Sequence, residues 1–164
     1  MKLLLLCILC ATLLASEHDL EFARLKTSFI AKYRQLKIPD LQLSYVKGFN
    51  EIQDLEGIAR QEQFYKDYQV KLKALDPETL GESNRIEYST LKYEVELGIS
   101  RLRLERQYRQ SGSPAITNQG IFFQQSGAPW YSLLVKRWTT RPFTIEKFQR
   151  LGQAEVDRNH KRIS

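Results

Sequence analysis

The residues able to bind a metal or attack a substrate are few in this 164-residue sequence. Its two histidines, His18 and His160, lie far apart, so they do not form the closely spaced pair that a zinc site on one helix needs. The two cysteines, Cys7 and Cys10, fall in an apolar segment at the N-terminus. No histidine lies near a suitable serine, so a nucleophilic triad would lack its base. The sequence therefore predicts no catalytic residue and no metal ligand in this chain.

Three aromatic residues, Trp130, Tyr131 and Trp138, indicate a site of another kind, one for binding. Tyr131 and Trp138 share a helical face with Leu134 and Val135, a pattern that is typical of a buried core. The alternative is that Trp130, Tyr131 and Trp138 form the aromatic wall of a cleft or of a partner surface. The spacing alone leaves both interpretations open.

Residues 1–15 have the pattern of a secretory signal peptide. Lys2 supplies a positive charge, an apolar run follows from Leu3 to Leu14, and Ala15 and Ser16 offer a small-residue cleavage site. The apolar run is too short for a stable transmembrane helix, so a retained anchor is the weaker alternative. We therefore expect export to the periplasm or the extracellular space, with no stable membrane span after cleavage.

A lipoprotein anchored through Cys7 or Cys10 is the weaker alternative, because leucine precedes both cysteines where a small residue is expected. Cleavage after Ala15 would remove both cysteines and leave residues 16–164, which are enough for one domain without disulfides. The full chain carries a net charge of +6, but basic and acidic residues alternate along the expected helices. This pattern is typical of a solvated helical surface and predicts no nucleic-acid partner.

The predicted fold is all-α, with several helices arranged around a long central helix at about residues 84–109. Asn84 is the expected N-cap, with Glu87 three residues later to complete a capping box. Apolar residues form two stripes on opposite sides, which predicts that the helix is covered on both. One stripe contains Ile86, Tyr93, Leu97, Leu104 and Tyr108, and the other contains Tyr88, Leu91, Val95, Ile99 and Leu102.

Apolar spacing and chain breakers predict the other elements. Residues 41–48 alternate like a strand, but we expect an extended connection because no partner strand is evident. Thr144 is expected to cap the last helix, which should bury Phe148, Leu151 and Val156 against another surface. Helices are predicted at residues 19–37, 50–75, 130–138 and 145–163, with a loop at 111–120 and an apolar plug at 121–123.

Two stretches resemble a large bacterial family known as domain of unknown function 885. The stretch LDPETLGESNRIEYSTLKYEVE, from Leu75 to Glu96, is similar to the family's leucine-aspartate start, short turn, Arg-Ile-acidic-Tyr run and leucine-rich helix. The stretch from Trp130 to Arg158 is similar to a family helix pair. In it, Leu151, Gly152, Glu155 and Val156 match a Leu-Gly-x-x-Glu-Val pattern.

The resemblance implies a secreted or lipid-anchored helical protein similar to zinc metallopeptidases. The His-Glu motif that would hold zinc in the family lies further toward the C-terminus, so none of it is carried over to this chain. We expect a truncated, non-catalytic N-terminal helical portion that walls or covers the active-site cleft, partnered by the missing C-terminal part. This chain alone would then hold no cofactor, although zinc is expected in the full-length family. The alternative is a free-standing exported helical module that binds a protein or peptide partner.

Overall fold

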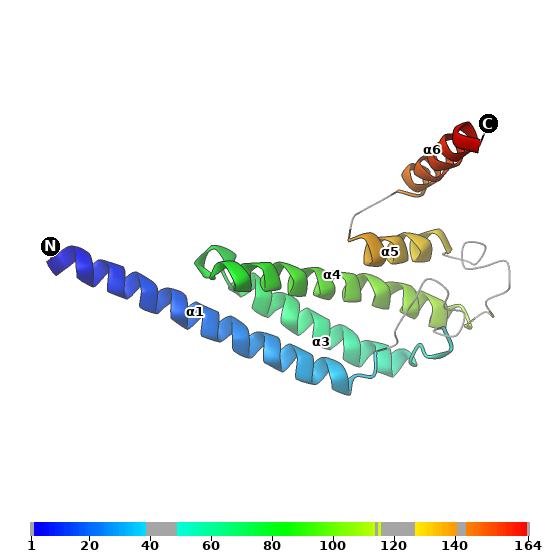
Figure 1. The fold of residues 1–164 in the computed structure, drawn as a ribbon. Helices are drawn as coiled ribbons and strands as arrows, with labels where there is room; N and C mark the ends of the chain where they lie inside the picture. The colour runs from blue at the N-terminus through cyan, green and yellow to red at the C-terminus, as the bar shows by residue number, and fades with distance from the viewer. Residues whose placement is uncertain (1, 39–48, 114, 116–126, 141–143, 164) are drawn as a thin grey trace. The chain divides into compact units, whose positions relative to one another are not determined.

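The computed structural model describes residues 2–38, 49–113, 115, 127–140 and 144–163, and these residues form an all-α fold (Figure 1). The long helix α4 is central to the arrangement, as the sequence predicts. The elements are α1 (Lys2–Gln35), α3 (Leu55–Ala74), the 3-10 helix η1 (Pro77–Thr79), α4 (Glu82–Gln110), α5 (Gly127–Thr139) and α6 (Ile145–Ile163).

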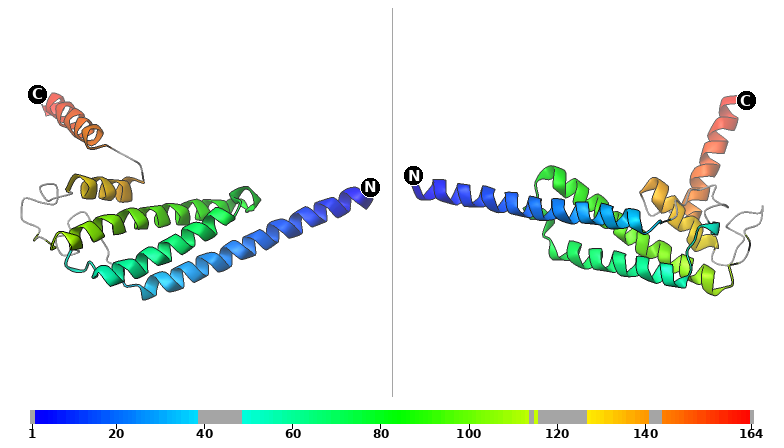
Figure 2. Two further views of the ribbon diagram at one scale, coloured as in Figure 1. Left: turned by 180° about the vertical axis from the view of Figure 1, so that it is seen from behind. Right: turned by 90° about the horizontal axis from the view of Figure 1, so that it is seen from below.

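The chain divides into two compact units, each described here by itself. The N-terminal unit contains residues 1–39 and 53–102, and the C-terminal unit contains residues 40–52 and 103–164. Helix α4 starts in the first unit and ends in the second. In the N-terminal unit, the C-terminal part of α1 lies beside α3 and the first part of α4 (Figures 1 and 2).

Helix α1 runs through the predicted cleavage site at Ala15 without a break. It ends at Gln35, and Lys37 then takes a positive φ of 47°, a left-handed conformation that stops a helix. Within the described residues, no helix combines the length and the apolar character needed to cross a membrane. The predicted extended connection at 41–48 lies outside the described residues.

Helix α3 begins at Leu55 and not at Asn50 as the apolar spacing predicts. Asp54 is the N-cap, because its Oδ1 accepts a hydrogen bond of 2.7 Å from the backbone N–H of Gly57. Leu55 therefore stands at the first helical position and is 44% exposed. The core face of α3 contains Ile58, Gln61, Phe64, Tyr65, Tyr68 and Leu72.

Helix α4 begins at Glu82, so the prediction of Asn84 as its N-cap is wrong. The carbonyl of Gly81 already accepts a helical hydrogen bond of 2.9 Å from Arg85 N–H. One predicted stripe is largely buried, with Tyr88, Leu91, Val95 and Leu102 in the core. The other is buried at Leu97 and Leu104, but Ile86 at its start is 65% exposed, so this side is covered only in part.

An aromatic cluster of Phe29, Phe64, Tyr65 and Tyr68 joins α1 to α3 in the N-terminal unit. The ring centroids of Phe29 and Phe64 are 5.0 Å apart, and Phe29 meets Tyr68 edge-on at 5.1 Å. Such contacts add to the free energy gained by burying the rings. Tyr68 also shares a hydrogen bond of 2.7 Å with Ser28 of α1, which satisfies its buried hydroxyl.

The C-terminal unit packs around Trp130 of α5, whose ring centroid lies 4.8 Å from that of Phe49. Thr144 caps α6 as predicted, because its Oγ1 accepts a hydrogen bond of 3.2 Å from Lys147 N–H. Helix α6 also has the predicted bounds, yet every side chain from Glu146 to Ile163 is exposed. The predicted apolar plug at 121–123 and most of the loop at 114–120 lie outside the described residues.

Candidate functional site

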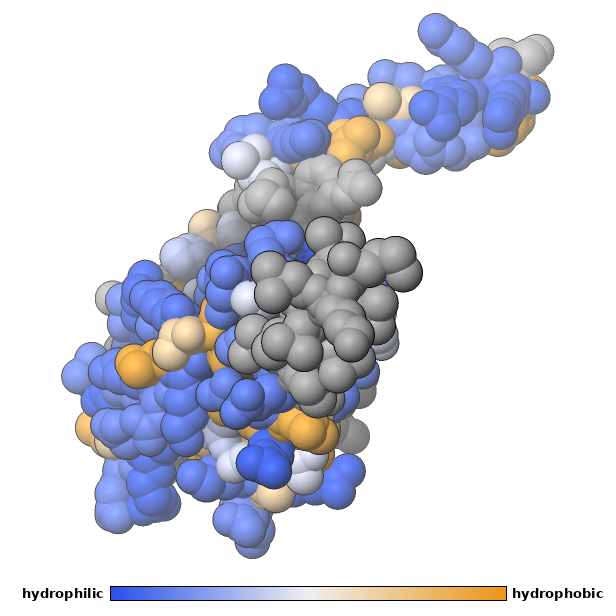
Figure 3. Space-filling view, turned by 90° about the vertical axis from the view of Figure 1, so that its left-hand side faces the viewer, coloured by the Kyte–Doolittle hydropathy of each residue, from blue (hydrophilic) through white to orange (hydrophobic). Residues whose placement is uncertain are grey.

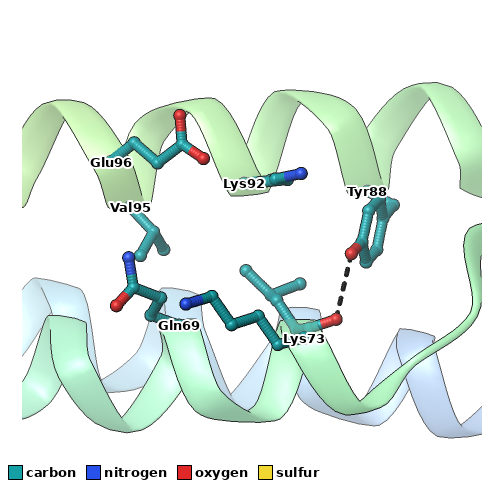
Figure 4. A pocket seen from close by; sticks show the side chains of 7 residues that line it. Gln69, Lys73, Tyr88, Lys92, Val95 and Glu96 are labelled. Carbon is teal, nitrogen blue, oxygen red and sulfur yellow. Dashed lines mark hydrogen bonds between the residues drawn. The ribbon is translucent and has the colours of Figure 1, made fainter.

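A small cavity lies between α3 and α4 in the N-terminal unit (Figure 4). Its volume is about 30 Å³. The hydroxyl of Tyr88 donates a buried hydrogen bond of 2.9 Å to the carbonyl of Leu72 at one end of it. The cavity is lined by Gln69, Leu72, Lys73, Tyr88, Lys92, Val95 and Glu96.

The size of this cavity decides what it can hold. Small-molecule sites usually enclose several hundred cubic ångströms, whereas roughly 10–15 Å³ is enough for one water. The polar ends of Lys73, Lys92 and Glu96 belong to exposed side chains at the opening, and Val95 is buried in the wall. The cavity therefore fits water between two packed helices and is too small for a substrate.

Asp19 of α1 joins this helix to the start of α4. Its Oδ1 accepts a hydrogen bond of 3.0 Å from Gly81 N–H and one of 2.8 Å from Asn84 Nδ2. The bond from Asn84, and then that from Gly81, lower the pKa of the Asp19 carboxyl, because both favour its charged form. A carboxylate of α1 therefore occupies the N-terminus of α4, where negative charge is stabilised.

Sequence reasoning missed this site because its two sides are more than 60 residues apart. The available signal was Gly81, which precedes α4 and has no side chain to cap it. A second long-range tie joins α1 to α4 nearby, where the ammonium of Lys26 contacts the carboxylate of Glu87. Glu87 therefore contacts another helix instead of completing a capping box with Asn84.

Two buried polar residues face each other between α3 and α4. The guanidinium of Arg101 donates a hydrogen bond of 2.7 Å to Gln61 Oε1, and both side chains are almost fully buried. In the C-terminal unit Glu105 is also fully buried. Buried charges of this kind serve packing specificity as often as chemistry, so they identify no reaction by themselves.

The three predicted aromatic site residues fall into different environments within the C-terminal unit. Trp130 is 2% exposed and belongs to the core. Tyr131 is half-buried, and its ring meets that of Phe148 edge-on at a centroid distance of 6.2 Å. Trp138 is 61% exposed at the end of α5. Of the three, only Trp138 presents most of its side chain to solvent.

Within the described part of the chain, no three histidine, cysteine, aspartate or glutamate side chains lie close enough to share a metal ion. On α1, His18 Nδ1 lies 4.0 Å from Glu21 Oε2, and on α6 His160 is exposed. Comparisons with protein-family models, with curated proteins and with solved structures find no match to this chain.

Proposed function

We propose that this chain is the non-catalytic N-terminal helical portion of an exported protein similar to the zinc metallopeptidase-like family described above. Its role would be that of a scaffold that walls or covers the active-site cleft of the full protein. The partner implied by this role is the remaining, C-terminal part of the same protein, which would carry the zinc ligands.

The observation that supports a scaffold role is how the family-like stretch from Leu75 to Glu96 uses its polar side chains. Asp76 Oδ1 accepts a hydrogen bond of 3.0 Å from Glu78 N–H, which caps η1. Asn84 bonds Asp19 of α1, and Tyr88 bonds the last turn of α3. These polar groups thus hold the first part of α4 against α1 and α3.

The reading frame downstream of the Ser164 codon tests this proposal. A continuation into a His-Glu motif with a second histidine a few residues later would support it. A stop codon at that position, together with a folded and monodisperse product, would contradict it.

The purified chain offers a biochemical test. We expect it to be helical by circular dichroism, free of zinc by elemental analysis and inactive on peptide libraries, because a catalytic zinc needs three fixed protein ligands. Tightly bound stoichiometric zinc with chelator-sensitive peptidase activity would contradict the non-catalytic role.

Export is part of the same proposal and has its own test. The apolar run before Ala15 leads us to expect a mature chain that begins at Ser16 or Glu17. N-terminal sequencing of the protein from its native host measures this directly. An intact Met1 or a lipid-modified Cys10 would be inconsistent with signal-peptide cleavage.

A second candidate function, a free-standing module that binds a protein or peptide, is favoured by Trp138. Large exposed aromatic side chains are enriched among the residues that dominate binding energy at protein interfaces. Selection from a displayed peptide library should then yield ligands whose affinity falls at least about tenfold with Trp138→Ala. The matched control is Ile86→Ala, which changes a similarly exposed apolar side chain of the N-terminal unit. Selected peptides whose affinity changes with neither substitution would argue against this function.

A further inference from the structure

The positive charge of the chain is concentrated at one end. Residues 127–164 contain eight lysines and arginines but three acidic residues, so they supply +5 of the net charge of +6. The preceding 126 residues are nearly balanced, with 17 basic and 16 acidic residues. Charges alternate within individual helices, but the last part of the C-terminal unit has an excess of positive charge, which attracts anionic surfaces.

Helix α6 combines this charge with an exposed apolar stripe. Phe148, Val156 and Ile163 recur at spacings that place them along one side, with Leu151 at its edge. All four residues are exposed: Phe148 by 41%, Leu151 by 53%, Val156 by 48% and Ile163 by 85%. The space-filling view shows hydrophobic atoms along an edge of α6 that is otherwise hydrophilic (Figure 3).

The basic residues of α6 lie mainly away from this stripe. At about 100° per residue, Lys147, Arg150 and Lys161 fall away from the stripe, Arg158 borders it beside Leu151, and Arg162 falls between Leu151 and Phe148. Glu155 falls within the arc of the stripe, between Leu151 and Phe148, and its carboxylate is paired with Arg158 at 2.7 Å. The last turn carries His160, Lys161 and Arg162.

Among the described helices, α6 has the sharpest separation of apolar from polar residues, with the lowest mean hydropathy. A helix with low overall hydropathy, a basic polar face and an exposed apolar stripe is suited to lie in the plane of a membrane surface. It can place apolar side chains among acyl chains while lysines and arginines meet lipid phosphates. A membrane-spanning helix or a core helix would need more apolar residues around its circumference.

We propose that α6 lies along the surface of an anionic lipid membrane, with Leu151, Val156 and Ile163 directed toward the acyl chains. Electrostatic attraction by the basic residues draws the helix to the surface, and burial of the apolar stripe holds it there. The interaction is peripheral and reversible. It does not depend on the scaffold role, because it uses only the surface of α6.

Binding of the full purified chain to vesicles tests this inference. The vesicles contain either phosphatidylcholine alone or phosphatidylcholine with roughly one third phosphatidylglycerol, which supplies negative surface charge. We expect the partition coefficient to be at least about tenfold higher for the anionic vesicles and to fall as salt rises from about 0.1 to 0.5 M. All variants are compared with the same N-terminus, so that the apolar leader, if retained, contributes equally.

Two pairs of variants locate the binding surface. The charge variant Lys161→Glu/Arg162→Glu should weaken anionic binding at least about tenfold, since each basic residue near the surface contributes roughly a fivefold factor. Its matched control, Arg24→Glu/Lys66→Glu, makes the same charge change on exposed residues of α1 and α3. The apolar variant Leu151→Asp/Val156→Asp should also abolish binding. Its control is Leu20→Asp/Val70→Asp, whose parent side chains are similarly exposed.

Three results would overturn the inference. The first is equal binding to neutral and anionic vesicles, and the second is anionic binding that the α6 variants leave unchanged. The third is a dimer in analytical ultracentrifugation that Leu151→Asp/Val156→Asp dissociates, without lipid binding by the parent chain. In that case the stripe is covered by a second copy. None of these results bears on whether the reading frame continues into zinc ligands, so the scaffold proposal stands or falls separately.

Discussion

The three packed helices of the N-terminal unit and helix α6 contain similar apolar side chains but use them in opposite ways. In α3 and α4 the apolar stripes are mixed with polar residues, yet Leu72, Val95 and Leu102 are almost completely buried. Helix α6 has the cleaner amphipathic pattern, yet Leu151 and Val156 remain about half exposed. Amphipathicity therefore predicts that a helix has a face to cover, but only a neighbouring surface decides whether that face is covered.

The largest difference in stability should appear when leucine is replaced by alanine in each of the two regions separately. Leu97→Ala removes a buried side chain from α4 and should lower the free energy of unfolding by about 2–5 kcal/mol, with a smaller loss for Val95→Ala. Leu151→Ala changes an exposed side chain of α6 and should stay within about 0.5 kcal/mol, like the surface control Glu94→Ala. Urea melts of the four variants measure this. A Leu97 as tolerant as Glu94 would mean that α4 is peripheral.

Two glycines sharpen the comparison with an expected effect of intermediate size. A Cβ added at Gly98 would overlap the ring of Tyr65, so Gly98→Ala should destabilise by about 1–3 kcal/mol despite alanine's better helix propensity. Nothing lies within 4 Å of a Cβ at Gly152, so Gly152→Ala should instead increase the helicity of α6. Circular dichroism during thermal unfolding reports both changes. If Gly98→Ala stabilises the chain as Gly152→Ala does, the contact between α3 and α4 at Gly98 is not tight.

The smallest expected effect concerns two carboxylates with lowered pKa values. Hydrogen bonds from Asn84 and Gly81 lower the pKa of Asp19, and bonds from its own backbone N–H and the Thr144 side chain lower that of Glu146. A carboxyl whose pKa is lower in the folded state stabilises the folded protein at pH values above its ordinary pKa, which is 3.8 for aspartate. This stabilisation is lost as the pH falls through the folded-state pKa. Asp19→Asn should therefore reduce the fall of the urea midpoint in acid.

Glu146→Gln is the control for that measurement, because the groups that lower the pKa of Glu146 belong to α6 and to its cap, Thr144. We expect this variant to leave the urea midpoint of the N-terminal unit and its pH dependence unchanged. An identical pH profile for Asp19→Asn and the parent chain would show that the tie between α1 and α4 contributes nothing to stability.

Elements determined by neighbouring residues could be predicted from the sequence. Thr144 and the bounds of α6 were predicted correctly, because a cap and its helix lie within a few residues of each other. The start of α4 was missed because its partner, Asp19, comes from another helix. The burial of Gln61, Arg101 and Glu105 was also missed, because helical periodicity describes apolar faces and not which polar groups meet inside them.

The tie between Asp19 and Gly81 also has a consequence for the order of folding. The Tyr88–Leu72 hydrogen bond closes a loop of 16 residues, whereas the Asp19–Gly81 bond spans 62. Shorter loops close at a lower entropic cost, so we expect the α3–α4 hairpin to form early and α1 to dock later. Loss of a late contact accelerates unfolding more than it slows folding. In stopped-flow chevron plots, Asp19→Ala should therefore raise the unfolding limb and leave the folding limb almost unchanged.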